Sequence, residues 1–216
     1  SGAVAERMKL IPFFLFAIIL TGFIYPVQGY WNWGGGWLDA IGYTDFAGSG
    51  VVHLCGAAAA LAAVIILGPR TGKYGSDGSI KVMRGSNIPI AALGALILWL
   101  GWFGFNGGSQ LAINDAANAN AVAQVFLNTN AAATGGVIGA LLIAKLLTGK
   151  ADVTMAINGA IAGLVSITAA PDTPSGGLAT IIGFVGGTVV YFSVVFLDTV
   201  LKIDDPVGAI SAHGTV

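Results

Sequence analysis

The sequence predicts an all-α membrane protein, a polytopic bundle of helices that cross the lipid bilayer. Only 9% of its 216 residues are charged and 56% are hydrophobic, whereas soluble domains carry about 25% charged residues. The apolar residues form long stretches separated by short polar gaps. Every Lys and Arg falls in alternate gaps or, for Lys145, within three residues of one, so all of the positive charge is predicted on one side of the bilayer. A soluble domain with so few charges would expose large apolar patches.

The apolar stretches give six complete spans and the start of a seventh, within a single transmembrane domain at residues 1–216. They cover residues 10–27, 46–68, 88–105, 117–147, 153–170 and 177–201, and then 207 onward. Each complete stretch approaches or exceeds the roughly 17–25 residues that a helix needs to cross ~30 Å of hydrocarbon. Asparagines interrupt the fourth stretch, which makes it the least regular. Because the seventh stretch stops at Val216, we expect a truncated part of a longer protein.

Turn-forming residues separate the stretches in order. The gap after the first stretch contains Gly34-Gly35-Gly36, and the second stretch closes at Gly68-Pro69. The fifth closes at Pro171-Asp172-Thr173-Pro174 and the sixth at Asp204-Asp205-Pro206. Glycine and proline at these points favour turns and end helices.

The positive charges predict the orientation. The nine basic residues are Arg7, Lys9, Arg70, Lys73, Lys81, Arg84, Lys145, Lys150 and Lys202. The gaps at 28–45, 106–116 and 171–176 contain none of them. By the positive-inside rule, segment 1–9 is cytoplasmic and the loop with Trp33 is external. We therefore expect a multi-pass protein of the cell membrane, meaning the plasma or inner membrane.

A short internal repeat places two histidines in the membrane. Asp45 precedes His53 by eight residues, and Asp205 precedes His213 by the same number. Because the copies lie on the second and seventh spans, they enter from opposite faces, as in an inverted-topology repeat. Eight helical residues rise about 12 Å, so both imidazoles are expected near the midplane. Ionisable side chains at that depth are functional candidates.

The residues themselves leave several roles open. The two histidines are either separately buried imidazoles or, as we favour, a pair that lines a pathway and serves a small polar solute or a proton. A metal site is disfavoured because no third ligand is expected at their depth. Asp205 is predicted to cap a helix, and for Asp45 capping and attraction of a cation are equally open. Trp33 is either an interfacial anchor or a ring face offered to a cation.

Four segments resemble the Amt/Mep/Rh ammonium transporters, on the Amt/Mep side. They are Asp45-Phe46-Ala47-Gly48-Ser49-Gly50-Val51-Val52-His53, Gly101-Trp102-Phe103-Gly104-Phe105-Asn106, Asp204-Asp205-Pro206 through His213-Gly214, and the opening Gly2-Ala3-Val4-Ala5-Glu6-Arg7. The resemblance implies a fold of eleven helices with inverted halves, of which this chain covers the fourth to the start of the tenth. It also implies a homotrimer and contact with a PII-type signal protein on the cytoplasmic face of the full-length protein.

The same resemblance implies two groups of site residues. The group that binds substrate at the outer mouth is Trp33, Ser109, Asp45 and Phe105. The group along the pore is Phe105, His53 and His213. Trp33 and Ser109 would capture ammonium, Asp45 would support that site, and Phe105 would be one of two stacked gating rings.

The implied function is transport of ammonium or ammonia through an apolar pore, and not an enzyme activity. Capture of the ion would be followed by deprotonation, because burying a bare ion is far more costly than burying neutral ammonia. Two alternatives stay open: an ammonium sensor of the same fold, and a passive channel for water or other small neutral solutes. The sequence predicts no cofactor, no metal and no nucleic-acid partner, since it contains no basic patch.

Overall fold

The computed structural model describes all 216 residues and confirms an all-helical membrane protein. Its only β pairing is an isolated bridge between Tyr74 and Ile80. Five helical segments are long and apolar enough to cross a bilayer. They are Leu10–Ala40, Ser49–Leu67, Ile88–Gly108, Ala116–Thr148 and Gly176–Thr199.

The first span is longer than predicted and is irregular. After the short helix η1 (Gly2–Val4), helix α1 (Leu10–Ile19) passes through a π-helical turn, η2 (Leu20–Ile24), into α2 (Tyr25–Trp33). The π-turn lies directly before Pro26, whose ring would clash with the carbonyl group four residues earlier in a regular helix. The helix therefore continues to Trp33 instead of ending at residue 27, and the short α3 (Trp37–Ala40) follows.

The second and third spans begin at defined caps. The second starts as a π-helical turn, η3 (Ser49–Leu54), and continues as α4 (Cys55–Leu67). It begins three residues later than predicted because Gly48 adopts φ +114°, outside the helical region. Helix α5 (Ile88–Gly108) begins after Asn87, whose side chain accepts a hydrogen bond from the Ile90 N–H.

Helices α6 (Ala116–Thr148), α7 (Val153–Thr168) and α8 (Gly176–Thr199) pack against one another. The asparagines do not break α6. Asn128 is fully buried, and its amide donates to the carbonyl oxygens of Pro171 and Pro174 at 2.8 and 2.7 Å. At 16 residues α7 is shorter than the predicted fifth span, about 24 Å long. Since α6 and α8 bury most of it, α7 need not match the thickness of the bilayer.

Glycines allow these three helices to touch through their backbones. A Cβ atom added at Gly183 of α8 would lie 1.9 Å from the Ala132 carbonyl oxygen of α6. One added at Gly187 would lie 2.0 Å from the Gly136 carbonyl oxygen. Small residues permit such close approach between membrane helices. Part of the high glycine content is thus explained by backbone contact between helices.

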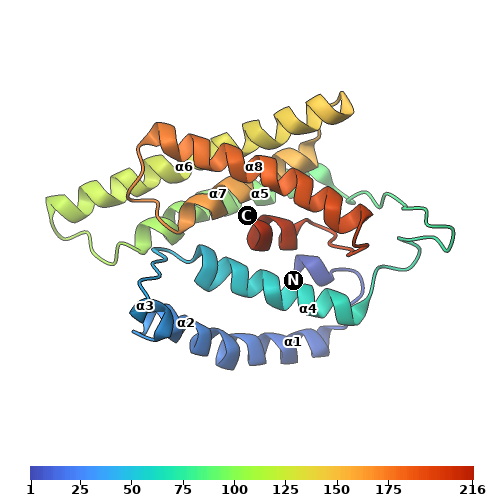
Figure 1. Ribbon diagram of the computed structural model, residues 1–216, viewed down its shortest axis with the longest axis horizontal. Helices are drawn as coiled ribbons and strands as arrows, with labels where there is room; N and C mark the ends of the chain where they lie inside the picture. Colours follow the sequence, from blue (N-terminus) through green and yellow to red (C-terminus); the bar gives the residue numbers. More distant parts are fainter.

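The two groups of helices enclose the C-terminal turn. In Figure 1, helices α5–α8 lie on one side, while α1, α2 and α4 lie on the other. The last helical turn, η4 (Ser211–Thr215), lies between α4 and α8 and contacts both, as well as α7 and η3. The chain therefore ends in the interior of the bundle.

The basic segments gather at one end of the bundle, as the charge pattern predicts (Figure 1). Arg70, in the loop after α4, pairs with Glu6 near the N-terminus and with buried Asp204 after α8. Lys73 of the same loop is buried and pairs with Asp198. Burial raises the pKa of the Asp204 carboxyl, but the hydrogen bonds from Arg70 outweigh it and leave the pKa below its usual value. We call Glu6, Arg7, Arg70, Lys73, Asp198 and Asp204 the basic-end cluster.

Candidate functional site

Asp45 accepts hydrogen bonds that cap the start of the second span, which is one of the two roles left open by the sequence. Its Oδ1 accepts hydrogen bonds from the N–H groups of Gly48 and Ser49 at 3.0 and 2.9 Å. Its Oδ2 accepts from Gly50 and Val51, both at 2.8 Å. The residue is only 4% exposed. Both carboxylate oxygens thus stabilise the start of η3, the turn that carries His53.

The second copy of the repeat has a similar but less complete local design, because Asp205 Oδ1 is buried without a hydrogen-bond partner. Asp205 Oδ2 accepts from the Ile210 N–H at 2.6 Å, five residues on, as Asp45 does from Gly50. Gly208 has φ +71°, in the position that corresponds to Gly48. The assumption of eight continuous helical residues is wrong, because a glycine turn occupies the first part of each copy. Each turn leads into a π-helical segment that carries a histidine, and π-bulges are frequent at functional sites.

The two histidines contact each other. Their Nδ1 atoms are 3.2 Å apart, and their ring centroids are 5.1 Å apart at an interplanar angle of 23°. A hydrogen bond at this distance requires one Nδ1 to carry a proton and the other to accept it, so two neutral rings must be different tautomers. The Nε2 atom of His53 is buried and has no hydrogen-bond partner. The pair can therefore pass a proton between rings or offer ring nitrogens to a small solute.

Two aromatic residues of α5 complete the histidine centre. The indole of Trp102 stacks on His53 at 4.8 Å and 15°, and it lies nearly parallel to His213 at 6.4 Å and 9°. Phe105 lies 5.4 Å from His53 at 44°. Phe103 turns away to pair with Phe126. We call His53, His213, Trp102 and Phe105 the histidine–aromatic cluster.

Trp102 is a site residue that sequence reasoning missed. It precedes Phe105 by three residues, a spacing that puts both side chains on one face of a helix. That signal was available once Phe105 had been singled out. The polar residues behind it, Thr168, Asn106 and Thr129, gave no sequence signal because they come from three different helices.

The predicted outer-mouth residues fall into two places. The Trp33 indole N–H donates to the Asp45 carbonyl oxygen at 2.7 Å, and both residues line a cavity of about 490 Å³. Ser109 and Phe105 are not in that lining. They lie together at the end of α5, where the Ser109 hydroxyl donates to the Phe105 carbonyl oxygen at 2.9 Å. Trp33 and Asp45 thus line one cavity, at the end of the bundle predicted to face outside (the outer cavity), while Phe105 belongs to the histidine–aromatic cluster.

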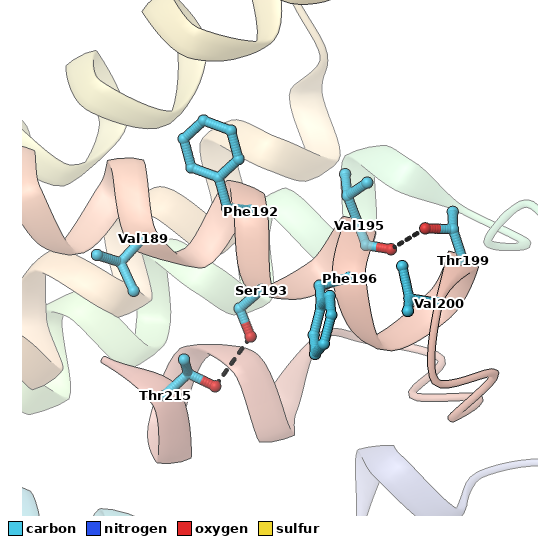
Figure 2. Close-up of a pocket in the computed structure, with 8 residues that line it drawn as sticks. All are labelled: Val189, Phe192, Ser193, Val195, Phe196, Thr199, Val200 and Thr215. Carbon is cyan, nitrogen blue, oxygen red and sulfur yellow. Dashed lines mark hydrogen bonds between the residues drawn. The ribbon is translucent and has the colours of Figure 1, made fainter.

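A separate apolar groove of about 540 Å³ lies along α8. Figure 2 shows its lining, with Phe192 and Phe196 on α8 and a hydrogen bond between Ser193 and Thr215. The Ser193 hydroxyl is 2.9 Å from the hydroxyl groups of both Ser211 and Thr215. These contacts hold η4, and with it His213, against α8. Neither histidine lines this groove.

Metal binding receives no support from the geometry. Neither histidine belongs to a group of three or more His, Cys, Asp or Glu side chains that could hold an ion. Structural metal sites use four protein ligands and catalytic zinc sites three.

Comparison with known proteins gives a consistent result. The sequence matches the Ammonium Transporter Family over residues 1–216. It is 43% identical to the ammonium transporter Amt2 of Archaeoglobus fulgidus, covering 99% of this chain and 47% of that protein. It is 38% identical to an ammonium transporter of Bacillus subtilis, covering 99% and 50%. The chain spans about half the length of the curated relatives it matches.

Solved structures agree with this result. A structure described as a sensor Amt protein has a TM-score of 0.94 at 39% identity, covering 99% of this chain and 53% of that one. Candida albicans Mep2 has a TM-score of 0.84 at 35% identity, covering 99% and 46%.

Proposed function

The chain belongs to the ammonium transporter family, and we propose that it forms part of a pathway that carries ammonium or ammonia across a membrane past His53 and His213. The observation that carries the proposal is the contact between the two histidines, 3.2 Å from Nδ1 to Nδ1. The pair is supplied by helical turns that enter from opposite ends of the bundle.

The chemistry of the histidine–aromatic cluster suits a neutral solute better than an ion. Trp102 and Phe105 offer ring surfaces, and no carboxylate belongs to the cluster. Burying a bare cation in such surroundings is very costly, whereas neutral ammonia needs only hydrogen-bond partners. Ammonium therefore gives up a proton to bulk water on the outer side of the histidines, and neutral ammonia passes them. The ring nitrogens supply a donor and an acceptor along the way.

The outer cavity is the proposed entrance. Trp33 presents an indole that is 49% exposed at the mouth, and a cation over such a face gains roughly 0.5–2 kcal/mol. Ser109 and Phe105 lie outside the lining of that cavity, and in this proposal they contribute a hydroxyl oxygen and the gating ring further along the path. Asp45 supports the entrance indirectly, because its carboxylate holds the turn against which the Trp33 ring packs. In this proposal Asp45 is a support and not a direct ligand.

The orientation and assembly follow the same proposal. The basic-end cluster faces the cytoplasm of a cell membrane and the Trp33 end faces outside, in keeping with the positive-inside rule. The complete protein is a homotrimer, and its cytoplasmic face contacts a PII-type signal protein. Transport is preferred to sensing because the relatives from Archaeoglobus fulgidus and Bacillus subtilis are both named as transporters.

The test is uptake by the protein expressed from its complete reading frame. Labelled methylammonium uptake, with ammonium as competitor, is measured for the wild type, His53→Ala and His213→Ala, with membrane insertion checked in parallel. We expect each substitution to lower uptake strongly or alter its selectivity while insertion persists. Unchanged flux and selectivity in both variants would defeat the proposal. A matched control is Thr134→Ala, an exposed position on α6 whose hydroxyl donates only to the Asn130 carbonyl oxygen of its own helix.

A further inference from the structure

Thr168 is a fully buried residue whose hydroxyl contacts the indole that covers the histidines. The Trp102 indole N–H donates to Thr168 Oγ1 at 2.9 Å, and both residues are buried, at 6% and 0% exposure. Thr168 lies at the end of α7, which carries neither histidine. Its hydroxyl forms no hydrogen bond with either imidazole, so any effect on the pair must pass through Trp102.

The direction of this hydrogen bond is fixed by the surroundings. The Thr168 hydroxyl donates its one proton to the Leu164 carbonyl oxygen at 2.6 Å. Its lone pairs are therefore left to accept from the indole. Asn106 Oδ1 lies 3.3 Å away, and the Asn106 amide in turn donates to the hydroxyl of Thr129 at 3.0 Å. Because the one hydroxyl proton goes to Leu164, Asn106 Oδ1 receives none, and Asn106 and Thr129 form a separate buried pair beside Thr168.

Thr168 also contacts the segment that leads to His53. Its backbone carbonyl oxygen accepts from the Ala47 N–H at 3.1 Å, just before the turn that begins η3. One residue therefore holds both the indole and the chain that carries the stacked imidazole. The two contacts are separable by mutation, because replacing the side chain leaves the backbone bond in place.

We propose that Thr168 is a positioning residue for the proposed pathway: its hydroxyl holds the Trp102 indole flat against His53 and His213. This inference rests on the proposed function for its transport consequence, but not for its geometry. The indole N–H is buried, and a buried donor without a partner is unfavourable. Without the hydroxyl the indole tilts to find another acceptor, and the two imidazoles lose the surface that keeps them parallel. The width of the passage beside the histidines then changes, and so does the rate of proton exchange between the two rings.

The main variant is Thr168→Val, which keeps the shape of the side chain and removes the hydroxyl. We expect methylammonium uptake by the complete protein to fall by roughly fivefold to tenfold, the effect of losing one buried hydrogen bond in the transport step. Thr168→Ser keeps the hydroxyl and should restore most of the uptake. Thr188→Val removes a partly buried hydroxyl on α8 that donates only to the Phe184 carbonyl oxygen of its own helix, and it should leave uptake within about twofold of wild type. Equal losses in both valine variants would show a general packing effect and overturn the proposal.

A double-mutant cycle tests whether Thr168 acts through Trp102. Trp102→Phe keeps a stacked ring but removes the N–H group. In that background Thr168→Val should have no further effect on uptake, because the bond it would break is already absent. Additive losses would overturn the proposal, since interacting residues should be coupled.

A spectroscopic measurement separates this inference from the proposed function. In the complete protein with ¹⁵N-labelled tryptophan and histidine, the Trp102 indole resonance is identified by its loss in Trp102→Phe. We expect Thr168→Val to shift that resonance and the imidazole resonances of both histidines, and Thr188→Val to leave the imidazoles unchanged. Unmoved imidazole resonances in Thr168→Val would overturn the positioning role, whatever the protein transports. Shifted resonances in a protein that carries no methylammonium would support positioning and defeat transport.

Discussion

Replacing Gly183 with alanine tests the close contact between α6 and α8. The new Cβ atom would lie 1.9 Å from the Ala132 carbonyl oxygen, where ordinary contact begins at 3.4 Å. Since the obstacle is backbone, no rotamer change relieves it, and the helices must separate locally by about 1.5 Å. Overpacking of this kind costs about 3 kcal/mol, and the better helix propensity of alanine returns about 1 kcal/mol. The expected net loss is about 2 kcal/mol.

Thermal unfolding in detergent micelles measures this loss. For a chain of this size, 2 kcal/mol corresponds to a melting temperature lower by about 4–8 °C. The matched control is Gly177→Ala on the same helix, because a Cβ atom there meets nothing within 4 Å. Its melting temperature should be unchanged or slightly higher. Equal melting temperatures for the two variants would refute the claim that backbone contact at Gly183 holds the helices together.

Three further predictions concern the caps and the basic-end cluster. Asp45→Asn removes one carboxylate oxygen from two buried N–H groups and should lower the free energy of unfolding by about 2–5 kcal/mol in a denaturant titration. Gly48→Ala should lower the melting temperature, because φ +114° strains any side chain and the Cβ atom would lie 2.4 Å from Val52. Asp204→Asn should cost about 3–5 kcal/mol at pH 7, since it leaves Arg70 without its buried partner. Because the folded pKa of Asp204 is lowered, its contribution is present above the unfolded value near pH 4 and is lost as pH falls through the folded pKa. Wild type should therefore lose more stability than Asp204→Asn when unfolding is compared at pH 6 and at lower pH.

The sequence predicted the helical membrane architecture from composition and from the period of its apolar stretches. It also predicted one basic end, and the basic segments do gather at one end of the bundle (Figure 1). Span limits were less accurate. Helix α7 is shorter than the predicted fifth span because it packs mainly against neighbouring helices. The first span is longer than predicted because it continues to Trp33 through a π-turn.

The histidine pair was anticipated from the repeat, although the reasoning about depth was wrong. Both copies begin with a glycine turn, so fewer than eight residues are helical before His53 and His213. The imidazoles nevertheless meet, because η3 and η4 pack directly against each other. Their proposed role in transport stays a prediction.

Residue type and local spacing are enough to predict the apolar spans, the end that carries the positive charge and the two repeated turns. That Trp102 covers both histidines and donates to Thr168 emerges only when the helices pack. These residues come from separate helices, and no spacing along a chain encodes which side chains meet when helices pack.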